Sequence, residues 1–250
     1  DQLRENSTQS NDFKPVSTFQ VTSPGEDADV QGQTEFNTSN TDSVNRMNIT
    51  KSAYAYRDNG LENVLFLKYE ITNPSWNHED TIHDLRVGLF NDWDLGDAYA
   101  NEVSYSTQDS LLYVFDTDTA NSMYAAAVPM GNLETAFAIN NAYQGEEDTL
   151  NFSIYGGSQY GARPGFSDYE KYHAMTAGRA HTSAGPSDVS ALVATGPYTI
   201  GRRSTVTTGF IYAWGNSLDE LKAQISNARA KEPFQVDTPG VIVANENRSP

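Results

Sequence analysis

The sequence predicts an all-β fold, mainly an antiparallel β-sandwich of jelly-roll-like type, with one amphipathic helix near the C-terminus. Apolar residues alternate with polar ones in many short runs, which is the period of a half-buried strand. Glycine, proline, asparagine and aspartate separate these runs, as turns separate the strands of a sandwich. One stretch, residues 218–231, has the strong spacing and flanking signals of a helix instead.

Composition divides the chain into three parts. Residues 1–45 are rich in small polar side chains and predict an N-terminal arm with possible edge strands. The sandwich domain is expected over residues 46–235, where the alternating runs are concentrated. Residues 236–250 are expected to form a C-terminal tail or linker.

The clearest strand is predicted at residues 64–72, where Leu65, Leu67 and Tyr69 share one face and Lys68 lies on the other. Pro74 ends this run. Weaker alternation predicts strands at 17–21, 32–36, 47–56, 85–90, 111–115, 122–128, 134–139, 149–155, 189–193, 198–200, 206–214 and 241–244.

Residues 156–190 are rich in glycine, alanine and proline and predict a long loop excursion with one short helix at 167–177. The predicted helix at 218–231 follows Ser217, a favourable N-cap residue, and Glu220 completes a capping box. Its apolar stripe, which is expected to pack on the sandwich, consists of Leu218, Leu221, Ile225 and Ala228.

An acidic loop joins two of the predicted strands and contains Asp92, Asp94 and Asp97 within six residues, followed by Asn101. Carboxylates this close repel one another, and a bound cation would remove the repulsion. Calcium takes six to eight oxygen ligands from such side chains. These four residues are therefore predicted to bind calcium. The alternative is a polar turn in which each aspartate accepts hydrogen bonds from the backbone.

The charge balance argues against two classes of partner. The chain has 33 acidic and 16 basic residues, for a net charge of −17. Binding to nucleic acid through a basic surface is not expected, and neither is attraction to an anionic membrane. The chain has no cysteine, which excludes disulfides and thiolate metal ligands. Its apolar runs are too short to span a bilayer, so membrane insertion is not expected.

Aromatic residues in the predicted loops indicate a second kind of site. Trp76, Trp93, Tyr99 and Tyr105 offer flat faces that stack on sugars or on peptides, so a polysaccharide or peptide ligand is one prediction. The alternative is that these rings pack over the rim of the sandwich. Catalytic residues are not predicted, because the chain has no GxSxG elbow. A hydrolase that uses two carboxylates stays open, since the sequence does not select the pair.

Several segments together resemble a known extracellular region. They are NVLFLKYEITNPS at 63–75, DLRVGLFNDWDLGDAYAN at 84–101, SLLYVFDTD at 110–118, and a long C-terminal block at 187–234 in which GPYTI precedes the SLDELKAQISNARA helix. They are similar to a β-rich accessory region found beside subtilisin-like protease domains and in other large secreted proteins of Bacteroidota and related phyla.

This resemblance implies a non-catalytic accessory or structural module of a secreted or cell-surface protein, not the protease itself. The expected partners are other domains of a larger secreted protein or copies of the same chain in a surface assembly. The residues add the possibility of calcium binding in the acidic loop. The open alternatives are a carbohydrate- or peptide-binding module and a carboxylate-dependent hydrolase.

Overall fold

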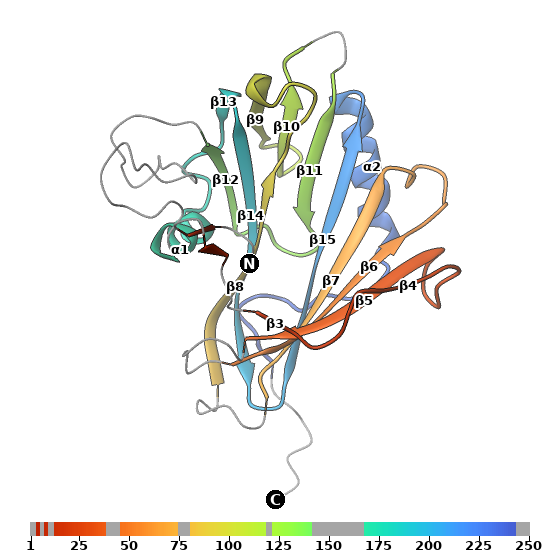
Figure 1. Cartoon of the computed structure of the whole chain (residues 1–250), viewed down its shortest axis with the longest axis vertical. Helices are drawn as coiled ribbons and strands as arrows, with labels where there is room; N and C mark the ends of the chain where they lie inside the picture. The colour runs from red at the N-terminus through yellow and green to blue at the C-terminus, as the bar shows by residue number, and fades with distance from the viewer. Residues whose placement is uncertain are drawn as a thin grey trace, which may run out of the picture.

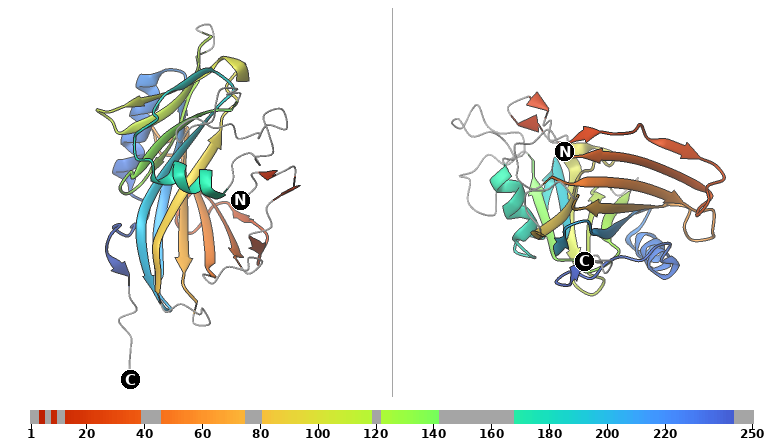
Figure 2. Two further views of the ribbon diagram at one scale, coloured as in Figure 1. Left: turned by 90° about the vertical axis from the view of Figure 1, so that its left-hand side faces the viewer. Right: turned by 90° about the horizontal axis from the view of Figure 1, so that it is seen from below.

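Two β-sheets pack face to face, and each carries a helix on its outer face (Figures 1 and 2). The computed structural model describes residues 13–38, 46–74, 81–118, 122–141 and 168–243. It also describes the backbone of two short paired strands, β1 (Arg4–Glu5) and β2 (Thr8–Gln9). The predicted class, an antiparallel sandwich with a helix near the C-terminus, is confirmed.

The larger sheet has ten strands, all antiparallel to their neighbours, and β15 at its centre pairs with β11 and β7. At one end of the sheet, β5 pairs along its full length with β6, and β3 and β4 lie on its outer edge. In spatial order the strands are β13 (Ala184–Ser187), β9 (Asn101–Ser106), β10 (Leu111–Asp116), β11 (Tyr124–Pro129), β15 (Thr205–Gly215), β7 (Val64–Thr72), β6 (Asn48–Ala55), β5 (Val30–Asn37), and the edge strands β3 (Lys14–Pro15) and β4 (Gln20–Thr22).

The smaller sheet is built around the long strand β14 (Val189–Gly201). On one side it pairs antiparallel with β8 (Thr81–Asp92), and on the other with β12 (Thr135–Asn140). The short strand β16 (Ile242–Val243) runs parallel to the end of β14. At the other end, the first residues of β14 lie between the last residues of β8 and the last residues of β12.

The main core lies between the two sheets. Val114 and Phe210 of the larger sheet and Ala191 and Val193 of the smaller one are fully or almost fully buried there. Within a strand, residues that face this core lie two positions apart, as Ala191 and Val193 do in β14. This spacing explains why the alternating runs predicted strands. A second buried cluster, around Tyr198 and Ile200, fills the space between the sheets nearer the other end of β14.

The helix α2 (Leu218–Lys231) lies on the larger sheet, against β15, β11 and β7. Ser217 caps it as predicted, since its Oγ accepts a hydrogen bond from the Glu220 N–H at 3.1 Å. Leu221, Ile225 and Ala228 of the predicted stripe are buried, whereas Leu218 is partly buried.

The shorter helix α1 (Asp168–Thr176) covers the outer face of the smaller sheet and confirms the helix predicted at 167–177. Ala174 is fully buried there. Met175 lies over Gly88 of β8, where an added Cβ would come within 3.0 Å of the methionine sulfur. Gly88 therefore lets the helix approach the sheet closely.

Several predicted elements differ in detail. The strands predicted at 189–193 and 198–200 are one strand, β14, whose register against β8 shifts near Gly196. The expected loop excursion contains β13, and the expected acidic loop contains β9. The strand predicted at 149–155 lies outside the described residues. No helix in the described parts of the chain is long and apolar enough to cross a membrane.

Candidate metal centre

Three carboxylates from distant parts of the sequence converge at one end of the smaller sheet. Asp92 is the last residue of β8, Asp94 follows it, and Asp188 immediately precedes β14. One carboxylate oxygen from each residue lies within 4.8 Å of the others. Two oxygens bound to one calcium ion at 2.3–2.6 Å are at most about 4.6–5.2 Å apart. The three oxygens are therefore spaced as the ligands of a single cation would be.

Two buried polar side chains orient two of these carboxylates. The Asn141 amide donates hydrogen bonds to Asp92 Oδ1 at 2.9 Å and to Asp188 Oδ1 at 2.6 Å. The Ser190 hydroxyl lies 2.9 Å from Asp92 Oδ1. Asn141 and Ser190 are both completely buried, so these contacts are shielded from water. Asp92 and Asp188 are thus held beside each other by the fold itself.

The electrostatic environment disfavours the ionised form of Asp92. Although the Asp92 side chain is exposed to solvent, the fold covers part of it, and this partial burial raises the pKa of its carboxyl above the usual range; the neighbouring charges of Asp188 and Asp94 raise it further. The hydrogen bonds from Ser190 and Asn141 act in the opposite direction and reduce the shift. A cation bound among the three carboxylates would reverse the effect of the neighbouring charges.

The other two residues predicted as ligands serve the loop itself. Asn101 is completely buried; its Oδ1 accepts a hydrogen bond from Leu95 N, and its Nδ2 donates to Leu95 O and to Asp97 O. Asp97 caps the short 3-10 helix η1 (Ala98–Ala100) through a hydrogen bond from Tyr99 N. Asp97 is not a member of the converging carboxylate group. Asp188 is a member of this carboxylate group, although the sequence did not predict it as a ligand.

The shape of the acidic loop also depends on Gly96. Its φ of +60° is in the left-handed region, and a Cβ at this position would overlap the carboxylate of Asp116. Asp116 is buried and pairs with Asn101 across β10 and β9. The loop is thus packed against the end of the larger sheet, and it projects Asp94 toward the smaller one.

Three of the predicted aromatic ligand residues lie in the described part of the chain, and their surroundings differ. Trp93 is partly buried in the core, and its ring meets Tyr212 edge-on with the centroids 5.6 Å apart. Tyr105 accepts a hydrogen bond from Arg179 and lies beneath its guanidinium. Tyr99 is 75% exposed, and Trp76 lies outside the described residues. Binding of a ligand by these rings stays a prediction.

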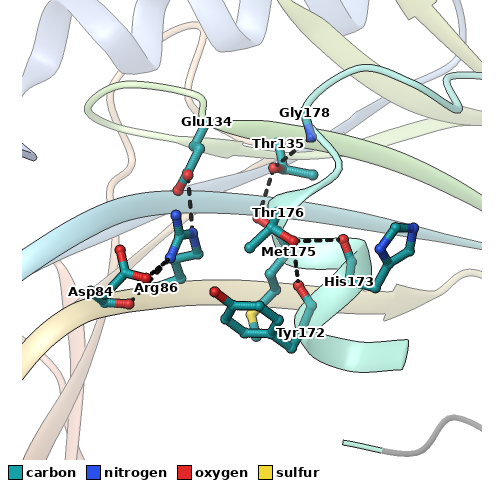
Figure 3. Close-up of polar contacts among 9 residues, drawn as sticks. All are labelled: Asp84, Arg86, Glu134, Thr135, Tyr172, His173, Met175, Thr176 and Gly178. Carbon is teal, nitrogen blue, oxygen red and sulfur yellow. Dashed lines mark hydrogen bonds and ion pairs between the residues drawn. The ribbon is translucent and has the colours of Figure 1, made fainter. Parts of the chain in front are cut away.

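A second polar cluster lies on the α1 side of the smaller sheet (Figure 3). The Arg86 guanidinium lies between Asp84 at 2.9 Å and Glu134 at 3.0 Å, and the ring of Tyr172 from α1 covers it. Thr135 donates a hydrogen bond to Met175 O near the end of α1. Because Arg86 keeps its charge and both carboxylates bind it, we interpret this cluster as the anchor of α1, not as a site for proton transfer.

No family model matches the chain, and no curated protein is significantly similar to it.

A substitution of Asn101 separates its structural role from a role as a metal ligand. We expect Asn101→Asp to lower the free energy of unfolding by about 2–4 kcal/mol, with or without calcium, because it removes two buried donated hydrogen bonds and places a carboxylate oxygen against carbonyl oxygens. Chemical denaturation measures this loss. A variant that is as stable as the wild type, and binds calcium more tightly, would instead identify Asn101 as a ligand.

The raised pKa of Asp92 predicts a pH-dependent effect in metal-free protein. Above the folded-state pKa, Asp92 is ionised in both states, and the partial desolvation of its charge, together with repulsion from Asp188 and Asp94, destabilises the fold. Below the unfolded-state pKa, about 3.9, this penalty is absent. In EDTA, Asp92→Asn should therefore unfold at a higher temperature than the wild type at pH 7, and the difference should shrink toward pH 4.

The control is Asp97→Asn, which keeps the cap of η1 through its side-chain oxygen and lies outside the carboxylate group. Its midpoint should follow that of the wild type across the pH range. An Asp92→Asn variant that gains no stability at pH 7, or gains more at low pH, would contradict the proposed penalty on the ionised form of Asp92.

Proposed function

We propose that this chain is a non-catalytic structural module of a secreted or cell-surface protein, stabilised by one calcium ion bound to Asp92, Asp94 and Asp188. The convergence of these three carboxylates is the observation that carries the proposal. Remaining ligands would be water or backbone oxygens, since calcium takes six to eight. The module would also be a subunit of a larger surface assembly.

The arrangement of the carboxylates supports binding more than hydrolysis. The two carboxyl groups of a glycosidase stand on opposite sides of the bond that they cleave, about 5–9.5 Å apart. Here the three oxygens gather within 4.8 Å on one end of one sheet. Asp92 and Asp188 also share one donor, Asn141. Carboxylates that share a donor in this way are close enough to bind one cation together.

The ligand types favour calcium over a transition metal. The group consists only of carboxylates, which suit hard cations, and the chain has no cysteine to bind softer ones. Two of the carboxylates, Asp92 and Asp94, are exposed. An accessible site with few protein ligands suits the affinity range of extracellular modules, with Kd about 10⁻⁴–10⁻³ M.

The resemblance to accessory regions of secreted proteins supports a location outside the cell. Its segments include the acidic loop and the C-terminal block that forms β14, β15 and α2. In the structure, the first of these segments supplies Asp92 and Asp94, and the block supplies Asp188. The resemblance and the carboxylate group therefore rest on the same two parts of the chain.

Thermal unfolding in EDTA and in calcium tests the proposal. At a calcium concentration one hundred times Kd, bound ion adds about 2.7 kcal/mol of stability, which is about 5–10 °C for a chain of this size. Asp188→Asn should abolish this rise, because it removes a ligand charge. Asp97→Asn should keep it.

The two variants make the outcome specific to the site. Equal calcium responses in Asp188→Asn and wild type would contradict the site assigned here. Loss of the response in Asp97→Asn alone would instead support the ligands predicted from the sequence. Midpoints that are the same in calcium and in EDTA for every protein would remove the metal from the proposal.

A further inference from the structure

We draw no further inference here: the strongest candidate, the inner face of the larger sheet around the partly exposed Lys51 of β6, whose ammonium group lies 5.6 Å from the centroid of the Tyr69 ring on the neighbouring strand β7, carries nothing because nothing in the structure shows what covers it.

Discussion

The register of β14 between β8 and β12 is the constraint on which the candidate site depends. Ser190 pairs with Asp92 on one side and with Ile139 on the other, so three strands end at nearly the same level. Asp188 and Asn141 then extend from two of these ends toward Asp92. A slip of one residue would turn Asp92 to the opposite face of the sheet. Backbone pairing therefore determines the geometry of the carboxylates.

The two buried amides at this end of the sandwich have different structural roles. Asn141 links the two carboxylates of β8 and β14, while Asn101 holds the backbone of the acidic loop. Both side chains are inaccessible to water, and leaving their polar atoms unpaired would be costly. These hydrogen bonds do not remove the repulsion between Asp92 and the other two carboxylates. A bound cation would remove it.

Local patterns predicted much of the fold. Alternation at 64–72 matches β7, and the capping box with its apolar stripe matches α2 at both ends. The strands β9 and β13 were missed because acidic, glycine and proline residues mask the alternation, and their pairing partners are distant in sequence. Asp92 and Asp94 were predicted because they are neighbours. Asp188 was not, because only the pairing of β14 with β8 brings it to them.

Luminescence of Tb³⁺ tests the central claim most directly, since this ion takes oxygen ligands as Ca²⁺ does and emits when an excited indole is close. Trp93 lies between Asp92 and Asp94 in the chain. We expect emission to saturate at one ion per chain, to fall when Ca²⁺ is added, and to be lost in Asp188→Asn. Emission that is absent from wild type, or unchanged in Asp188→Asn, would contradict a cation site built from these three carboxylates.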